Sequence, residues 1–275
     1  MLFAPLLVLL GLGVGTFGTL VGAGGGFLLV PILAILEPSL PTPAITAVSL
    51  AVVAMNATSG AIAYARQGRI DLRSGVPFAL ATLPGSVIGA IVSRSVPRQI
   101  FDVVLAALLI ALALFIGLAH DEEARPAAKG GGWGRARRQI VDAGGTRYGY
   151  DVNMPLGVAM SFAVGFVSSL LGIGGGVIHV PALVGVLGFP THIATATSHF
   201  TLAIMATAGT ATHLAAGDLQ DLLIETALLG VGAIVGAQLG ARLSARVHGT
   251  AIVRALALSL AFVGFRLGIQ GLFGM

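Results

Sequence analysis

A run of three glycines inside an apolar stretch occurs twice in this chain of 275 residues. The first copy reads Gly-Ala-Gly-Gly-Gly-Phe-Leu-Leu-Val-Pro over residues 22–31, and the second reads Gly-Ile-Gly-Gly-Gly-Val-Ile-His-Val-Pro over residues 172–181. Consecutive glycines have no side chains to pack and carry the largest backbone entropy cost in a helix. Each run therefore predicts a break in an apolar helix, at corresponding places in the two halves of the chain.

The composition places both breaks in a membrane. Hydrophobic residues make up 56% of the chain and charged residues 9%, whereas an ordinary soluble domain has about 25% charged residues. Apolar runs of about 20 residues, the length that crosses a hydrocarbon core, recur in both halves without the alternation of a membrane barrel. We therefore predict an all-α polytopic membrane protein. Unpaired backbone groups are costly in hydrocarbon, so both breaks are expected to face the protein interior.

Each half repeats the same order of apolar segments. A full span is followed by the glycine break, a short segment and three more full spans. The full spans are expected over residues 3–21, 44–65, 74–93, 100–119, 155–172, 191–215, 220–243 and 251–272. The segment that follows each break is too short to cross alone at roughly 1.5 Å per residue. The predicted fold therefore has about eight full spans plus two short segments, arranged as tandem repeats.

A charged segment separates the two repeats. Membrane repeat 1 is expected at residues 1–119 and membrane repeat 2 at residues 155–275, with a charged cytoplasmic linker at residues 120–154. Because the linker is polar and rich in glycine, we expect a loop that is partly disordered.

The distribution of Lys and Arg residues predicts the orientation of the repeats. If the first span and its short partner enter the membrane and return, each repeat crosses an odd number of times and the repeats are inverted. All but three of the 15 Lys and Arg residues then lie on one side, which an excess of basic residues marks as cytoplasmic. Parallel repeats would instead place residues 216–225, which include no Lys or Arg, in the cytoplasm. We therefore expect inverted repeats with both termini outside, and we interpret the net charge of +4 as an orientation signal and not as nucleic-acid binding.

Three sequence elements resemble a known family of membrane proteins. They are the doubled glycine phrase that ends in proline, the Thr-Ala-x-Ser sequence at residues 46–49 and 195–198, and the Gly-x-hydrophobic element at residues 68–70 and 217–219. Together they are similar to the sulfite exporter TauE/SafE family, also called TSUP, over the whole chain outside the linker. The resemblance implies a permease of the inner membrane for small anions such as sulfite, sulfoacetate or another organosulfonate. It leaves the particular anion and the direction of transport open.

The glycine breaks are the first candidates for a substrate site. After each break a short helix begins with unpaired N–H groups and the positive end of a helix dipole, which attracts anions. In transporters built from inverted repeats, substrate binds near the midplane where broken helices meet. The alternative is that these glycines serve only close helix packing. The candidates are Gly24, Gly25, Gly26, Gly174, Gly175 and Gly176.

Polar side chains in the span after each break form a second group of candidates. Thr46 and Ser49 in the first half match Thr195 and Ser198 in the second, and their hydroxyls can donate to an oxyanion. Asn56 adds an amide donor further along the first of these spans. Hydroxyls in membrane helices more often bond to their own backbone or to a neighbouring helix, so a packing role is the alternative.

Histidines distinguish the second half, because the first half has none at the corresponding places. His199, beside Ser198, is the strongest single candidate for contact with the substrate. Because histidine titrates near neutral pH, His199, His213 and His179 are candidates for coupling proton movement to anion movement. A neutral, hydrogen-bonded histidine is the alternative for each. No metal is expected, since the chain has no cysteine and these histidines have no carboxylate nearby in the spans.

These features favour a secondary transporter that moves a small anion by alternating access and is coupled to protons. Its expected partners are the anion, protons and the lipid bilayer, with no cofactor and no nucleic acid. A membrane enzyme would need a nucleophile, a metal cluster or paired carboxylates, which the spans do not provide. An anion channel and a permease for a small carboxylate remain as alternatives, and the oligomeric state stays open.

Overall fold

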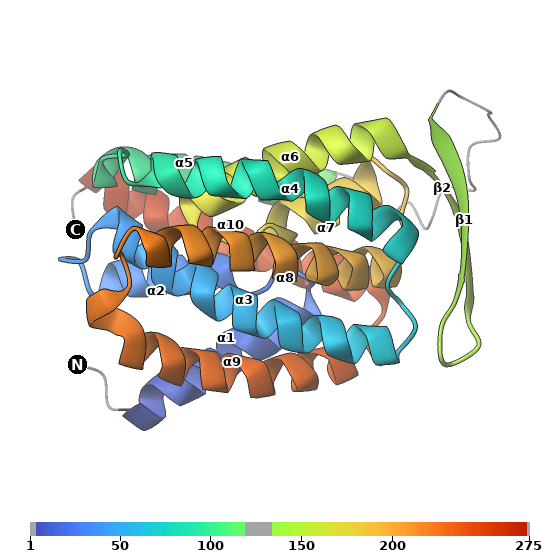
Figure 1. Cartoon of the computed structure of the whole chain (residues 1–275), viewed down its shortest axis with the longest axis horizontal. Helices are drawn as coiled ribbons and strands as arrows, with labels where there is room; N and C mark the ends of the chain where they lie inside the picture. Colours follow the sequence, from blue (N-terminus) through green and yellow to red (C-terminus); the bar gives the residue numbers. More distant parts are fainter. Residues whose placement is uncertain (1–3, 119–133, 274–275) are drawn as a thin grey trace.

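The computed structural model describes residues 4–118 and 134–273 as a bundle of helices with one β-hairpin at its end (Figure 1). The elements in chain order are α1 (Ala4–Leu20), α2 (Gly26–Leu36), α3 (Thr42–Arg66), α4 (Leu72–Ser93), α5 (Arg98–Leu118), β1 (Arg135–Val141), β2 (Arg147–Asn153), α6 (Met154–Leu171), α7 (Gly176–Gly185), α8 (Thr191–Ala215), the 3-10 turn η1 (Gln220–Leu222), α9 (Leu223–Ser244) and α10 (Gly249–Phe273).

The predicted spans coincide with helices to within a few residues, but fewer of them qualify as full crossings. Within the described ranges, six helices are long and apolar enough to span a membrane: α3, α4, α5, α6, α9 and α10. α1 has only 17 residues. α8 has 25 residues but carries three histidines and many threonines. The prediction of about eight full spans therefore exceeds the six that length and apolar composition support.

Helices at equivalent places in the two halves make equivalent contacts. α1 packs along α9 of the other half, and α6 packs along α4 in the same way, while α5 lies against α10. α3 and α8 lie side by side at the centre (Figure 1). Thr46, near the start of α3, lies beside His213, near the end of α8. Thr197, near the start of α8, contacts Asp71, which follows α3. α3 and α8 are therefore antiparallel.

Glycines allow the paired helices to approach at backbone distance. A Cβ atom added at Gly232 or Gly236 of α9 would overlap backbone atoms of α1. One added at Gly85 or Gly89 of α4 would overlap backbone atoms of α6. Glycines four residues apart therefore form the packing faces of α9 and α4, and the same device serves both halves.

The described part of the linker is an ordered antiparallel hairpin, in which Arg135 pairs with Asn153 and Val141 with Arg147. The hairpin corrects the prediction of a loop over residues 135–153 and of a wholly α-helical chain. The prediction that the linker is partly disordered stays untested, because residues 120–133 lie outside the described residues. Side chains of β2 are alternately more and less buried, as in a strand with one covered face. Tyr150 packs against Phe189 with ring centroids 4.6 Å apart, beside the end of α7.

Asp71 anchors the hairpin to the helices. This buried carboxylate caps the first turn of α4 and accepts hydrogen bonds from the Ser74 hydroxyl at 2.6 Å and the Tyr150 hydroxyl at 2.7 Å. Nε of Arg138 lies 3.5 Å from the same oxygen. A buried charge needs such partners, so hairpin and helix start are held by one carboxylate.

Asp142 makes a second attachment, from the hairpin turn to the loop after α3. Its carboxylate pairs with Arg69 at 3.4 Å and accepts hydrogen bonds from the backbone N–H groups of Gly144 and Thr146. Burial works to raise the pKa of Asp142, but the backbone donors and the Arg69 guanidinium outweigh it, so the pKa lies below its ordinary value. The carboxylate is therefore ionised at neutral pH, as the ion pair requires.

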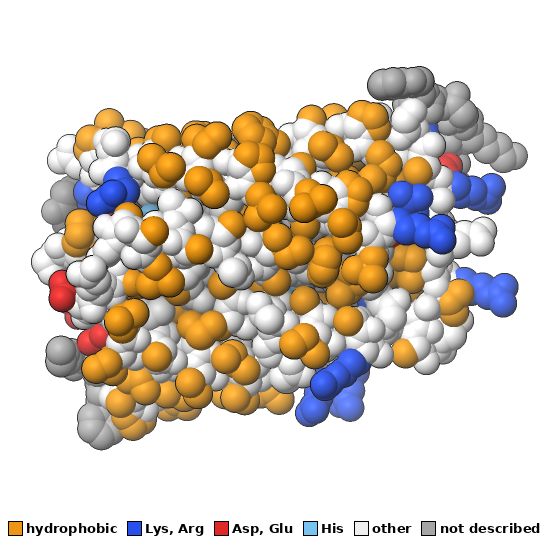
Figure 2. Space-filling model, in the orientation of Figure 1, with side chains coloured by type: hydrophobic (Ala, Val, Ile, Leu, Met, Phe, Trp, Pro, Cys, Tyr) orange, Lys and Arg blue, Asp and Glu red, His pale blue; other side chains and the backbone are white. Residues whose placement is uncertain are grey.

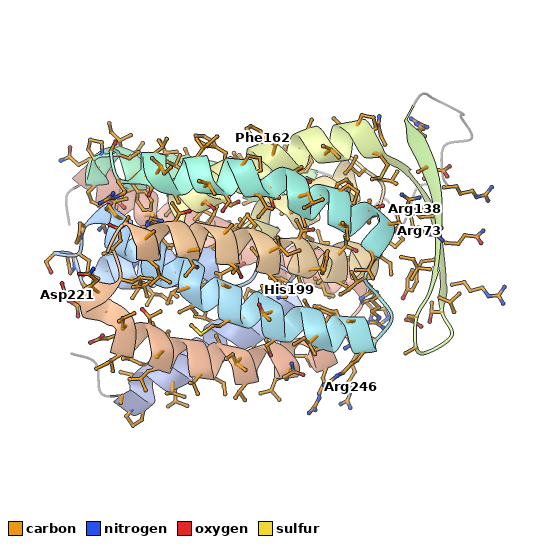
Figure 3. All side chains as sticks on the ribbon, in the orientation of Figure 1. Arg73, Arg138, Phe162, His199, Asp221 and Arg246 are labelled. Carbon is orange, nitrogen blue, oxygen red and sulfur yellow. The ribbon has the colours of Figure 1, made fainter. Side chains whose placement is uncertain are left out.

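Charged side chains gather at the two ends of the molecule, mainly Lys and Arg at one end and both signs at the other, while orange hydrophobic side chains cover the sides between them (Figure 2). The basic end carries the hairpin together with Arg73, Arg138 and Arg246, and the acidic end carries Asp221 (Figure 3). Both α1 and α10 have their free ends at the acidic end (Figure 1). The molecule therefore has the two polar caps and the apolar belt of a membrane-embedded bundle.

Candidate functional site

The two glycine breaks meet at the centre of the molecule. Every residue from 21 to 27 and from 171 to 177 is buried, as predicted for breaks that face the protein interior. A Cβ atom added at Gly26 would overlap the backbone of Ile173, and one added at Gly176 would overlap the backbone at Gly22. The breaks of the two halves therefore form one cluster of backbone, which we call the central cluster (residues 21–27 and 171–177).

Most of the glycines are required by backbone conformation as well as by space. Gly24 and Gly174 have φ of 76° and 74°, in the left-handed region that other L-residues rarely adopt. Gly25 also has a positive φ of 86°. Its counterpart Gly175 has φ of −61°, an ordinary helical value. The two breaks are thus similar but not identical.

The N-terminal ends of α2 and α7 both lie in the central cluster. Within the described chain, the backbone N–H groups at positions 25–27 and 175–177 donate to no backbone carbonyl. Helix starts normally leave such donors unpaired, and together with the helix dipole they give each start a partial positive charge. Two positive helix ends therefore converge on the place where the halves touch.

The far end of α2 is held by a cation. Arg98 donates from Nη1 to the Leu40 carbonyl at 3.2 Å and from Nη2 to the Ala34 carbonyl at 3.4 Å. Its Nε lies 2.9 Å from the carboxylate of Asp102. A cation at the C-terminal end of a helix complements the helix dipole. α7 has no such clamp among the described residues and instead ends against the aromatic contacts of the hairpin.

The matched serines bond across the halves to the opposite break. The Ser49 hydroxyl donates to the Gly172 carbonyl at 2.6 Å, and the Ser198 hydroxyl reaches toward the Gly22 carbonyl at 3.4 Å. Both serines are fully buried. The structure thus places the predicted serines and glycines together, with the serine hydroxyls already bonded to protein.

The matched threonines differ from each other. The Thr46 hydroxyl donates to carbonyls of its own helix, at Thr42 and Pro43, which is the packing role weighed for it. The Thr195 side chain lies against Gly22 through its methyl group, and its hydroxyl is buried and has no hydrogen-bond partner within the described residues. A buried hydroxyl without a partner is uncommon, because it forfeits its hydration. Thr195 is therefore the hydroxyl of this group that is free to bind a ligand.

His199 and Asn56 belong to one buried network beside the first break. The Thr19 hydroxyl donates to Oδ1 of Asn56 at 3.0 Å, and Nε2 of His199 lies 3.2 Å from the Thr19 oxygen. The Tyr64 hydroxyl donates to the Thr19 carbonyl at 2.7 Å. Since the single hydrogen of Thr19 goes to Asn56, Nε2 of His199 acts as the donor. Nδ1 of His199 is buried without a hydrogen bond of good geometry.

His179 and His213 lie apart from this network. Nε2 of His179 is 3.3 Å from the Ser161 hydroxyl, and its ring meets Phe78 edge to face. His213 lies near the acidic end of α8, with Nδ1 2.8 Å from the carboxylate of Asp218. The three candidate histidines therefore do not form one site. The sequence interpretation missed Asp218, because a separation of five residues is not a helical neighbour spacing and becomes a contact only where α8 ends.

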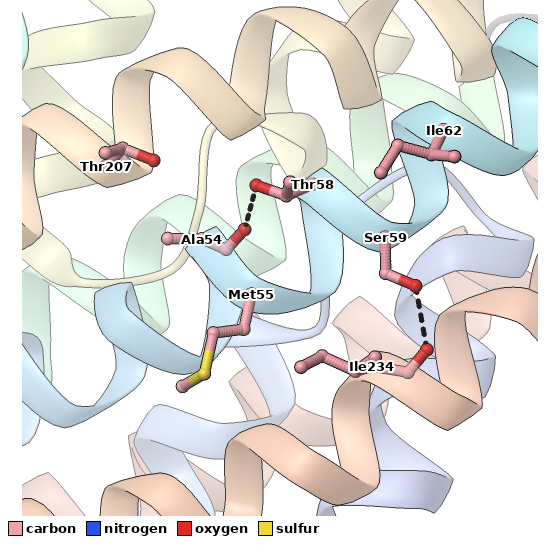
Figure 4. A pocket seen from close by; sticks show the side chains of 7 residues that line it. All are labelled: Ala54, Met55, Thr58, Ser59, Ile62, Thr207 and Ile234. Atoms are coloured by element: carbon pink, nitrogen blue, oxygen red, sulfur yellow. Dashed lines mark hydrogen bonds between the residues drawn. The ribbon is translucent and has the colours of Figure 1, made fainter.

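A surface groove of about 410 Å³ lies between α3, α8 and α9 (Figure 4). None of the predicted site residues lines it, and its Thr58 and Ser59 hydroxyls donate to the carbonyls of Ala54 and Ile234. The central cluster, in contrast, is closed by backbone contact. No three side chains of the kinds that bind metals come together in the part of the chain that the structure describes. The lining residues of the groove are Ala54, Met55, Thr58, Ser59, Ile62, Thr207 and Ile234.

Comparisons with known proteins place this architecture in a family. The sequence profile of the family described as Sulfite exporter TauE/SafE matches residues 7–267. The probable membrane transporter protein YunE of Bacillus subtilis (strain 168) is 34% identical, with 98% of each chain covered. A probable membrane transporter protein of Methanocaldococcus jannaschii is 27% identical over 66% of this chain and 62% of its own length. No solved structure matches the chain significantly.

The profile match covers nearly the whole chain and the YunE alignment extends over both halves, so the relationship is not confined to one half. Six long apolar helices agree with the relatives' description as membrane transporters. The chain is a multi-pass membrane protein that belongs to the sulfite exporter TauE/SafE family.

Proposed function

We propose that this protein is a secondary transporter that carries a small anion across the inner membrane by alternating access. The observation that carries the proposal is the meeting of the α2 and α7 N-termini in the central cluster, where unpaired N–H groups and two positive helix ends converge. Such ends bind anions without a basic side chain. This accounts for an anion site in a region where the described residues include no Lys or Arg.

The substrate is a sulfur oxyanion or an organosulfonate, of which sulfite and sulfoacetate are examples. Two kinds of donor in and beside the central cluster are free, the N–H groups at the two breaks and the Thr195 hydroxyl, while the Ser49 and Ser198 hydroxyls and Nε2 of His199 donate to protein in this closed arrangement. Several donors around one point suit an ion with three oxygen atoms around its sulfur. The family description as sulfite exporter supports this class of substrate.

The closed contact between the breaks is one stage of the transport cycle. Residues 1–119 and 155–275 act as inverted membrane repeats, which the antiparallel arrangement of α3 and α8 supports. Separation of the repeats at one end and then at the other opens the central cluster to each side in turn. The basic end, with the linker at residues 120–154, is cytoplasmic, and both termini are outside.

Binding of anions to the purified protein tests the proposal first. Thermal denaturation is measured with sulfite, thiosulfate, sulfoacetate, taurine, sulfate and small carboxylates, each at two pH values. We expect a sulfonate or a sulfur oxyanion to raise the denaturation midpoint, because a ligand that binds only the folded state stabilises it. No shift with any of these anions, in protein shown to be folded, would contradict the proposed substrate class.

Transport kinetics separate the carrier from its alternatives, an anion channel and a permease for a small carboxylate. In proteoliposomes a carrier saturates and shows counterflow, in which unlabelled anion on one side drives labelled anion from the other. A channel conducts without exchange. Stabilisation and counterflow by a carboxylate alone would favour the carboxylate permease. Coupling to protons is part of the proposal, and His199, His213 and His179 are its candidates.

A further inference from the structure

A chain of polar side chains leads from the surface of the acidic end to His213. The Arg94 side chain is 50% exposed, and its Nε lies 3.4 Å from the Asp218 carboxylate, which is 10% exposed. The other oxygen of Asp218 lies 2.8 Å from Nδ1 of His213, whose side chain is completely buried. An arginine stays protonated, so the steps that can carry a proton are Asp218, which is 10% exposed, and the completely buried His213, with Arg94 at the exposed end beside them.

The inner end of this chain reaches the second glycine break. Nε2 of His213 lies 3.5 Å from the Thr46 hydroxyl, which is longer than a strong hydrogen bond. Gly172 packs so closely on Thr46 that a Cβ atom added there would lie 2.8 Å from the Thr46 Cα. Ser49, one turn further along α3, donates to the Gly172 carbonyl. Two contacts, that of His213 with Thr46 and that of Thr46 with Gly172, therefore connect His213 to the central cluster.

Both ring nitrogens of His213 face hydrogen-bond acceptors. Asp218 is an acceptor when ionised, and Thr46 already donates its hydrogen to its own helix, so its oxygen accepts from His213. A neutral imidazole has one N–H and satisfies one of these acceptors, whereas an imidazolium satisfies both. When His213 is neutral, the Thr46 hydroxyl must turn away from its backbone carbonyl to reach Nε2. Protonation therefore changes the hydrogen bonding of a residue that packs on the break.

The charges around His213 suit a group that alternates between protonation states. Within the described chain, the charged groups that face it are Asp218, from the loop after α8, and Arg94 behind it, at the end of α4. α3 contributes the uncharged Thr46. A buried cation requires a partner of opposite charge, and Asp218 provides one.

The other histidines of the second half lack this arrangement. His179 and His199 contact the hydroxyls of Ser161 and Thr19, and neither has a carboxylate within salt-bridge distance in the described part of the chain. The first half has Tyr64 at the position that matches His213, and a phenol does not titrate near neutral pH. His213 is therefore the only one of the three candidates whose charged form is paired.

We propose that His213, paired with Asp218, is the proton-binding group that couples transport to the proton gradient, and that it is reached from the acidic end. This inference rests on the proposed anion carrier. Asp218 is a positioning residue, since it orients the imidazole and stabilises its protonated form. Protonation from the acidic end strengthens the contact with Thr46 and so favours one arrangement of the second break.

The test uses the full chain in proteoliposomes with labelled sulfoacetate, whose two acidic groups both stay ionised around neutral pH. Two rates are measured: net uptake driven by a pH gradient, and counterflow without a gradient. In His213→Gln we expect net uptake to lose its dependence on pH while counterflow remains. In Asp218→Asn we expect the midpoint of the pH profile to move about one unit toward acid, because the charge that favours the imidazolium is gone. His192→Gln, the same change at the other end of α8, is the matched control and should behave like the wild type.

The outcomes distinguish this inference from the function on which it depends. Wild-type counterflow with an unchanged pH profile in both His213→Gln and Asp218→Asn would overturn the inference and leave the carrier intact. Absence of saturable counterflow in the wild type, with sulfoacetate and also with sulfite, would overturn both. If His213→Gln does not fold, proton uptake on sulfoacetate binding is measured with a pH indicator in wild type and Asp218→Asn. An identical uptake in the two proteins across the pH range would then reject the role of the pair.

Discussion

Gly176 and Gly175 are adjacent residues that the structure predicts to differ in their tolerance of a methyl group. A Cβ atom at Gly176 would overlap the backbone at Gly22, which cannot move without separating the halves. At Gly175 the backbone is helical, and the nearest atom to an added Cβ is the flexible Met205 sulfur at 3.0 Å. We expect Gly176→Ala to cost about 1–3 kcal/mol by overpacking and Gly175→Ala to cost less. Thermal denaturation in detergent compares them, and equal stability of the two variants would contradict the backbone contact.

The matched serines offer a second comparison at the same scale. Ser49→Ala removes a hydrogen bond of 2.6 Å and leaves the Gly172 carbonyl buried without that donor, which costs about 1–3 kcal/mol. Ser198→Ala removes a contact of 3.4 Å and should cost less. The order of the two denaturation midpoints checks this expectation. A larger fall of the denaturation midpoint in Ser198→Ala than in Ser49→Ala would show that the strength of these two hydrogen bonds does not follow their length.

At the scale of elements, the hairpin depends on the phenol of Tyr150. Tyr150→Phe removes a hydrogen bond of 2.7 Å to the buried carboxylate of Asp71, whereas Tyr148→Phe removes a contact of 3.4 Å to Asp142. Trypsin cleavage within residues 135–147, which include four arginines at exposed or partly exposed positions, reports release of the hairpin. We expect faster cleavage in Tyr150→Phe than in Tyr148→Phe. Equal rates in both variants and in the wild type would mean that Asp71 does not hold the hairpin in place.

The sequence predicts the helices well because their signal is local. Apolar runs, proline and glycine place every helix within a few residues, and the repeated glycine phrase identifies the two breaks. The hairpin was missed because its strands are charged, although Gly144 and Gly145 between two alternating runs are a turn signal that could have indicated it. Contacts between distant segments, such as Thr19 with Asn56 and His199, could not be derived, because they depend on how the two halves fit together.

At the scale of the whole molecule, the absence of cysteine allows the orientation to be measured directly. Single cysteines introduced as Thr146→Cys at the hairpin turn and Asp221→Cys at the acidic end lie at exposed positions. With a membrane-impermeant maleimide on intact cells, we expect Asp221→Cys to react and Thr146→Cys to react only after permeabilisation. The reverse pattern would place the basic end outside and contradict the proposed topology.

The two short helices end in dissimilar anchors, the Arg98 clamp for α2 and the aromatic contacts of the hairpin for α7. In a carrier with identical inverted halves, the inward-open and outward-open forms would be related by a two-fold rotation and have equal free energy, so each would be occupied half of the time. Dissimilar anchors remove that degeneracy, and a difference of about 1.4 kcal/mol would favour one form tenfold. If the protein is the proposed carrier, its unloaded form spends most of its time with one face open, and the half-saturation concentration for substrate differs between the two sides of the membrane.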